Sequence, residues 1–238
     1  ATEKYSTKIQ NLKDNIKISD TTTIRSYANT ITSTELKNLL YTYASKEFEG
    51  RGTGEEGQKK AANFLKTYYL SQNISSPIND SVYFQTIPKS YFPDDTKETE
   101  NVVAYIEGIE KPEEVLVISA HYDHLGIEDD QIYYGADDDG SGTVALMEMA
   151  QAFKMAAKDG FGPKRSILFL HLTAEEIGLQ GSRFYTENPI FIKQVLQIAD
   201  QNVGYLMYNG FKLDNIIDTK AKTKSAQNLR TRIQSNQE

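Results

Sequence analysis

Two short apolar runs constrain the fold of this chain more than any other feature. Residues 115–120 read VLVISA and residues 166–172 read SILFLHL, so each run is apolar at nearly every position instead of at alternate positions. A strand has this composition when helices cover both of its faces. We therefore predict that the two runs are central strands of an α/β sheet.

A long helix is expected between these strands. Residues 141–158 are apolar on most sides, and their polar side chains fall in one stripe, formed by Glu148, Gln151, Lys154 and Lys158. This pattern is typical of a helix that lies flat on a sheet, and Gly160 and Pro163 can end it. Because strand–helix–strand units cross over with a right hand, this order predicts a largely parallel sheet.

Two further helices are expected before the sheet. Thr32 and Glu35 have the spacing of a capping box, which predicts a helix start at this point. Thr53 and Glu56 have the same spacing and predict a second helix that runs to about Gln72. Both helices carry apolar residues on one face, so we expect them to pack against the core.

Additional strands and one structural ion pair are also expected. Residues 81–93 are aromatic and β-branched, and Pro88 cannot donate to a strand ladder, so this segment predicts an edge strand. Residues 101–108 and 195–207 are expected to form two more strands. Arg51, in a glycine-rich loop, is expected to be a structural ion-pair partner.

The composition excludes some classes of partner and site. Lys and Arg number 26 against 33 Asp and Glu, a formal charge of −7, so a nucleic-acid partner that relies on phosphate neutralisation is not expected. The chain has no cysteine, so any metal ion must be bound by His, Asp and Glu side chains. No apolar run approaches the roughly 20 residues of a membrane span.

The length of 238 residues suits one α/β domain, since no low-complexity segment divides the chain. We expect a polar N-terminal segment at residues 1–30, the α/β domain at residues 31–208 and an atypical tail at residues 209–238. Ala1, in place of an initiator Met, fits a mature chain from which a signal peptide was removed. The expected location is therefore secreted or periplasmic.

His121 and Asp123 form the first candidate pair for a functional site. They lie two positions apart at the end of the first central strand, where side chains point to the same side. The Asp123 carboxylate can then hold the tautomer of a metal-binding His121, as supporting carboxylates do in metal sites. The alternative is a histidine in a surface loop that pairs with its neighbour.

Two clusters of carboxylates complete the candidate site. Asp137, Asp138 and Asp139 lie between glycines just before the long helix, and Glu175 and Glu176 follow the second central strand. Such a density of like charge is unfavourable unless a cation or a helix N-terminus offsets it. Taken singly, the first cluster also fits an Asx-rich turn and the second an acidic helix start. Together with the His–Asp pair they converge on one edge of the sheet, and they would suit two divalent cations about 3.5 to 4 Å apart.

These residues also resemble the co-catalytic di-zinc aminopeptidases typified by bacterial leucyl aminopeptidases. HYDHLG, GADDDGSGTVALMEMA and FLHLTAEEIGLQGSRFY are similar to three successive motifs of that family, and EFEGRGTGEEGQKKAANFL is similar to its N-terminal region. The resemblance covers residues 34 to 202. It implies a zinc-exopeptidase-like three-layer α/β/α sandwich with a mostly parallel (mixed) central sheet. It also implies a strained peptide bond, which could be cis, beside the bridging aspartate.

The resemblance assigns a role to each candidate residue. It implies that His121 binds one zinc ion, that Asp138 bridges two ions and that Glu176 binds the other. Glu175 is then the general base, and Asp123 orients His121. The implied reaction removes the N-terminal residue from a peptide or aminoacyl substrate with a free amino terminus. Glu175 would take a proton from a metal-bound water, and the resulting hydroxide would attack the scissile carbonyl.

The sequence departs from the family after the glutamate pair. Two more metal ligands are expected there, an Asp and a late His, but Gly204 stands at the expected Asp position and no histidine follows His171. Asp200 lies four residues too early. Each ion would keep two protein ligands, whereas catalytic zinc sites have three plus water, so activity is in doubt. We expect a truncation or reading-frame change near residue 200, so that the fold lacks its C-terminal part. The alternatives are a non-catalytic peptide-binding relative and a glutaminyl-cyclase-like enzyme with one metal.

The other two histidines are expected to be structural. His124 fits the family's loop without a ligand role there. His171 lies inside a buried run and is predicted to be a neutral, hydrogen-bonded core residue.

Overall fold

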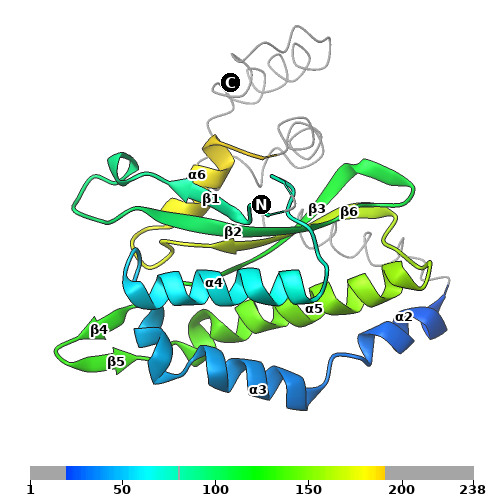
Figure 1. The fold of residues 1–238 in the computed structure, drawn as a ribbon, viewed down its shortest axis with the longest axis horizontal. Helices are drawn as coiled ribbons and strands as arrows, with labels where there is room; N and C mark the ends of the chain where they lie inside the picture. Colours follow the sequence, from blue (N-terminus) through cyan, green and yellow to red (C-terminus); the bar gives the residue numbers. More distant parts are fainter. Residues whose placement is uncertain (1–19, 80, 191–238) are drawn as a thin grey trace, which may run out of the picture.

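A four-stranded mixed sheet lies at the centre of the molecule (Figure 1). The computed structural model describes residues 20–79 and 81–190. Within them the strands are, in spatial order, β1 (Phe84–Ile87), β2 (Thr99–Ile106), β6 (Arg165–Leu172) and β3 (Lys111–His121). β6 runs parallel to β3 and antiparallel to β2, and β1 runs antiparallel to β2. The predicted α/β class with a mixed sheet is confirmed, and the parallel pair joins the two strands that the apolar runs predicted. The other two strand pairs of this sheet are antiparallel, so the expected predominance of parallel pairs is not seen among the described strands.

Helices cover both faces of the sheet and make three layers (Figure 1). α4 (Glu56–Ser71) and α5 (Ser141–Lys158) lie on one face, and α6 (Gln180–Glu187) lies on the other. α2 (Thr21–Ala28) and α3 (Ser33–Tyr43) pack on the outer side of α5. This arrangement agrees with the α/β/α sandwich that the family resemblance implied.

The alternation of side chains along β6 explains why its sequence is apolar throughout. Ile167 and Phe169 belong to the larger core, which lies between the sheet and α4 and α5. Leu168 and Leu170 belong to a smaller core on the opposite face, together with Tyr185 of α6. Each face of β6 is therefore buried by a different layer of helices.

β3 differs from β6 because it lies at one edge of the described sheet, whereas β6 lies between β2 and β3. Its side chains Leu116 and Val117 are 53% and 36% exposed. The prediction that helices cover both faces of residues 115–120 is wrong at these two positions.

β3 and β6 end side by side at one edge of the sheet. Their register pairs Ala120 with His171 and His121 with Leu172, so the segments that follow the two strands begin next to each other. After β3 the chain forms a two-stranded ribbon, β4 (Gly126–Glu128) and β5 (Gln131–Tyr133), and then the turn Ala136–Gly140, which leads into α5. This edge is where the predicted site residues lie.

The predicted helix starts have different outcomes. The capping box of α3 is confirmed, because Glu35 N donates to Thr32 Oγ1 at 3.2 Å and the hydroxyl donates to the Glu35 carboxylate at 2.6 Å. The predicted cap of α4 is wrong. The residue before α4 is Glu55, whose side chain makes no capping bond, and Thr53 Oγ1 donates to Asp123 Oδ2 at 2.7 Å instead.

Several predictions concern residues outside the described ranges. They are the strand at residues 195–207, Asp200, Gly204 and the tail at residues 209–238. The domain boundaries also stay predictions. Within the part of the chain that the structure describes, no helix combines the length and the apolar character that a membrane crossing requires.

Candidate metal centre

Three side chains come together at the edge where β3 and β6 end. His121 Nε2 lies 3.0 Å from Asp138 Oδ1, and one ligand atom from each of His121, Asp138 and Glu176 lies within 4.8 Å of the others. His121 and Glu176 are half-buried, whereas Asp138 is exposed. One imidazole nitrogen and two carboxylate oxygens are ligands that zinc accepts, and three protein ligands plus water form a catalytic zinc site. The donor set of these three residues therefore fits one zinc ion.

Asp138 and Asp139, in the acidic turn before α5, make different contacts. Asp138 belongs to the cluster, and the peptide bond between Asp138 and Asp139 is cis, in agreement with the family resemblance. Asp139 Oδ1 instead accepts from Gly142 N at 3.0 Å, in the first turn of α5. Asp139 thus agrees with the explanation as an Asx-rich turn, while Asp138 lies in the three-residue cluster.

Asp123 supports His121 in another way than expected. The carboxylate of Asp123 is 3.8 Å from His121 Nδ1, and the backbone carbonyl of Asp123 is closer, at 3.2 Å. A proton on Nδ1 that is donated to this carbonyl would leave the lone pair of Nε2 directed at the cluster. The carboxylate accepts from Thr53 Oγ1 at 2.7 Å and from Glu175 N at 3.2 Å. Its burial raises the pKa of Asp123 to about 6, against the lowering effect of these two hydrogen bonds.

Glu175 and Glu176 have different surroundings. Glu176 Oε1 lies 2.6 Å from His124 Nδ1, so His124, expected to be structural, contacts a candidate ligand. Glu175 is half-buried, its backbone N–H is bonded to Asp123, and its carboxylate is not part of the three-residue cluster. The structure thus brings His121, Asp138 and Glu176 together and leaves Glu175 beside them.

The sequence did not predict the contacts that two residues, Arg51 and Thr53, make near the cluster. Arg51 was expected to form an ion pair, which is wrong, because its fully buried guanidinium donates to backbone carbonyls and has no recorded carboxylate partner among the described residues. Thr53 was assigned to a helix cap but contacts Asp123. The signal that could have indicated them is the glycine spacing around them in GRGTG, which allows two backbones to approach closely.

His171 is a core residue, as predicted. Its side chain is fully buried, and its Nε2 lies 2.7 Å from the hydroxyl of Tyr69 on α4. Burial lowers the pKa of His171 to about 3, so the imidazole is neutral.

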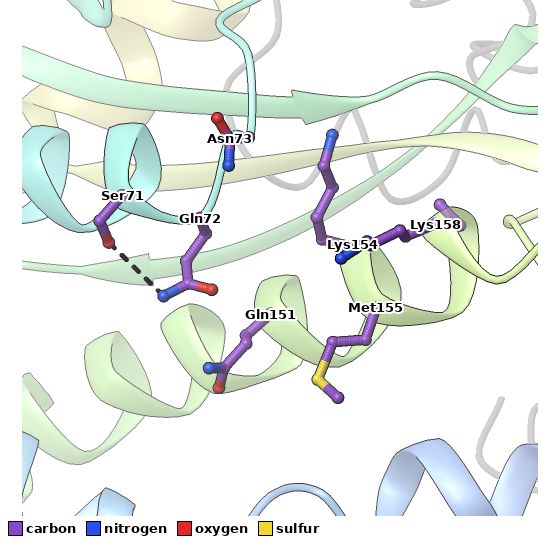
Figure 2. Close-up of a pocket in the computed structure, with 8 residues that line it drawn as sticks. Ser71, Gln72, Asn73, Gln151, Lys154, Met155 and Lys158 are labelled. Atoms are coloured by element: carbon purple, nitrogen blue, oxygen red, sulfur yellow. Dashed lines mark hydrogen bonds between the residues drawn. The ribbon is translucent and has the colours of Figure 1, made fainter.

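A groove elsewhere on the surface contains none of the candidate site residues (Figure 2). It has a volume of about 480 Å³ and lies between the end of α4, at Ser71, Gln72 and Asn73, and α5, where Lys154 and Lys158 line it. The metal centre and this groove are therefore separate features.

Comparison with protein families gives one match over more than half of the chain. The model described as "Peptidase family M28" matches residues 101–233, a stretch that contains all five predicted site residues.

Curated relatives match at low identity. "Glutamate carboxypeptidase 2 homolog" from Caenorhabditis elegans is 28% identical, over 73% of this chain and 20% of that protein. "Probable aminopeptidase YDR415C" from Saccharomyces cerevisiae is 27% identical, over 56% of this chain and 39% of that protein. The chain therefore spans less than half of the length of these relatives.

Solved structures share the fold. LapB from Legionella pneumophila superposes with a TM-score of 0.51 at 23% identity, over 79% of this chain and 44% of that one. A leucine aminopeptidase precursor from Bacteroides thetaiotaomicron superposes with a TM-score of 0.51 at 17% identity, over 67% of this chain and 57% of that one. At this level of identity the likeness concerns the fold alone.

Proposed function

The chain belongs to peptidase family M28, and from this membership we propose that it provides the zinc-binding core of an aminopeptidase. The proposed reaction removes the N-terminal residue from a peptide or aminoacyl substrate with a free amino terminus. The observation that supports this proposal most is the cluster of His121, Asp138 and Glu176, whose ligand atoms lie within 4.8 Å of one another.

The proposed roles follow from the contacts of each residue. When bound, zinc supplies a Lewis acid that polarises the scissile carbonyl and acidifies a water molecule. His121 would bind it through Nε2, while Nδ1 faces the backbone carbonyl of Asp123 at 3.2 Å. Asp138 and Glu176 would contribute one carboxylate each. Their negative charges offset the charge of the cation.

Glu175 is proposed as the general base. It would accept a proton from the attacking water and return it to the leaving amine. The hydrogen bond from Glu175 N to the buried Asp123 carboxylate, at 3.2 Å, holds its backbone beside the cluster. Its carboxylate is not among the three clustered groups, which leaves it available for proton transfer.

The number of zinc ions is part of the proposal. Among the described residues the donors fit one ion, and a second ion, with Asp138 as the bridge, would need ligands from elsewhere. Gly204 stands at the position where the family has an Asp ligand, and this departure leaves two alternatives open: a peptide-binding relative without turnover and a glutaminyl-cyclase-like enzyme with one metal. A secreted or periplasmic location is likewise a proposal, which fractionation of the source cells tests.

Glu175→Gln tests the proposed mechanism. Turnover of aminoacyl-nitroanilide substrates should fall by roughly 10²- to 10⁴-fold, the usual contribution of a general base, while zinc content by elemental analysis stays unchanged. The matched control is Glu110→Gln, because Glu110 pairs with Lys164 on the surface. Full turnover in Glu175→Gln would contradict the role of Glu175. Peptide binding without turnover by the wild type would favour the non-catalytic alternative.

A further inference from the structure

Arg51 joins the segment that follows His121, at the end of β3, to the segment that leads to Asp138. Its Nε donates to the carbonyl of Tyr122 at 2.9 Å, one residue after His121. Its Nη2 donates to the carbonyl of Gly135 at 2.7 Å, three residues before Asp138. One guanidinium thus spans the loop after β3 and the turn before α5.

The remaining contacts of this guanidinium tie it to the scaffold. Nη1 donates to the carbonyls of Tyr43, at the end of α3, and Tyr134, at 3.2 and 3.0 Å. The ring of Tyr43 lies 4.5 Å from the Arg51 Cζ atom. Four of the five N–H bonds of an arginine are used, in directions that its planar fork fixes. A lysine ammonium lacks this fork and cannot reach the same set of carbonyls.

The backbone next to Arg51 holds the same loop from a second side. The carbonyl of Arg51 accepts from His124 N at 3.1 Å, and Gly52 forms a parallel bridge with His124. Thr53 Oγ1 donates to the Asp123 carboxylate at 2.7 Å. Three consecutive residues therefore fix the position of residues 122 to 124.

Gly135 leaves the space that this contact requires. A Cβ atom at Gly135 would lie 2.6 Å from Arg51 Nη2 and 2.5 Å from His124 Cγ, and its φ of +52° suits glycine. The close approach of Arg51 to the segment before the acidic turn therefore depends on two residue types: the arginine in one segment and the glycine at position 135 in the other.

We propose that Arg51 is a positioning residue for the metal centre: it sets the separation between the His121 loop and the Asp138 turn before a zinc ion binds. This inference rests on the proposed function only in taking His121 and Asp138 as ligands. Groups that support metal ligands change metal affinity by about 10- to 100-fold when they are lost. Arg51 is fully buried, and its side-chain hydrogen bonds among the described residues go to backbone carbonyls, so it would act through the backbone of the two segments.

The test is the zinc affinity of the full chain with Arg51→Lys, measured by competition with a chromophoric chelator. The matched control is Tyr69→Phe, which removes a buried hydrogen bond to His171, in the core and away from the ligand loops. Both variants should melt at a lower temperature than the wild type. Zinc affinity should fall at least about 10-fold in Arg51→Lys and stay within about twofold in Tyr69→Phe.

Equal zinc affinity in the two variants would overturn the positioning role while leaving the proposed function intact. A wild type that binds zinc but hydrolyses no peptide would overturn the proposed function, and the two variants would still decide the role of Arg51. A wild type that binds no zinc contradicts both.

A second measurement applies if Arg51→Lys does not fold. In the zinc-free wild type, the Nε–H of Arg51 should exchange with solvent far more slowly than that of a free arginine, because it is already bonded to Tyr122. Exchange at the free rate would show that the loops are not held before the ion binds, and would overturn the inference.

Discussion

Two histidines lie one register step apart on neighbouring strands and have opposite surroundings. His171 of β6 pairs with Ala120 and is fully buried against Tyr69 of α4. His121 of β3 pairs with Leu172, and its side chain is 14% exposed and 3.0 Å from Asp138. Successive residues of a strand point to opposite faces, so a single step separates a core position from a site position. The comparison shows that the face of the sheet and the distance from the strand end decide the surroundings of each histidine.

The same substitution should weaken metal binding strongly at His121 and leave it nearly unchanged at His171. His121→Gln should lower zinc affinity by more than the roughly 100-fold that loss of a supporting group causes. His171→Gln should leave zinc affinity within about twofold. Zinc titration in the presence of a competing chelator measures both. The comparison breaks if His171→Gln weakens zinc binding as much as His121→Gln does.

The two histidines also differ in how they respond to acid. Burial lowers the pKa of His171 to about 3. Between this value and the ordinary histidine pKa of about 6.5, the residue is protonated in the unfolded chain and neutral in the folded chain. This stability is present above the unfolded pKa and is lost as the pH falls towards the folded pKa. Between pH 6 and pH 4 the loss is about 1.4 kcal/mol per pH unit.

Denaturant unfolding of the wild type and His171→Gln at several pH values checks this slope. The difference between the two proteins is the informative quantity, because burial raises the pKa of Asp123 to about 6 and gives the zinc-free protein an opposite dependence in the same range. A difference that stays constant with pH would mean that His171 is not a neutral core histidine.

The third histidine sharpens the comparison. His124 Nδ1 lies 2.6 Å from Glu176 Oε1, so His124→Ala removes a supporting contact of a proposed ligand. Zinc affinity should fall by about 10-fold, less than in His121→Gln, because no ligand is lost. Isothermal titration with zinc measures the order. A loss as large as that of His121→Gln would make His124 a ligand and would change the proposed coordination.

The smallest expected effect compares one hydrogen bond at the site edge with one in the core. Thr53→Val removes the bond to Asp123, and Tyr69→Phe removes the bond to His171. Each variant leaves one buried polar atom without its partner and should lower the free energy of unfolding by about 1 to 3 kcal/mol. Thermal melts compare the two costs. A near-zero cost for Thr53→Val would mean that solvent replaces the threonine hydroxyl at Asp123.

The pattern of apolar residues correctly predicted the helix and the strand whose apolar faces pack against other elements of the core. The bounds of α5 agree with the predicted residues 141–158, because an apolar face ends there at Gly160 and Pro163. β6 is also as expected, because its apolar run is covered on both faces. The same reasoning was less successful for β3, which lies at an edge of the described sheet and exposes Leu116 and Val117.

Contacts between distant segments could not be predicted from local patterns. Thr53 has a sequence environment suited to a helix cap, yet its hydroxyl is bonded to Asp123, seventy residues away. The two-residue period of a strand correctly predicted that Asp123 lies on the same side as His121. The Asp123 carboxylate, however, accepts hydrogen bonds from Thr53 Oγ1 and Glu175 N, and it is the backbone carbonyl of Asp123 that lies nearest to the His121 imidazole. Arg51 donates to backbone carbonyls, and because every residue has a carbonyl, the sequence does not indicate which ones it binds.

The most direct test of the metal centre is an anomalous difference map from crystals of the zinc-loaded full chain. We predict a zinc peak about 2.0 to 2.2 Å from His121 Nε2 and from carboxylate oxygens of Asp138 and Glu176. A peak at any other position, or no peak between these three side chains at full zinc loading, would contradict the assignment of this site.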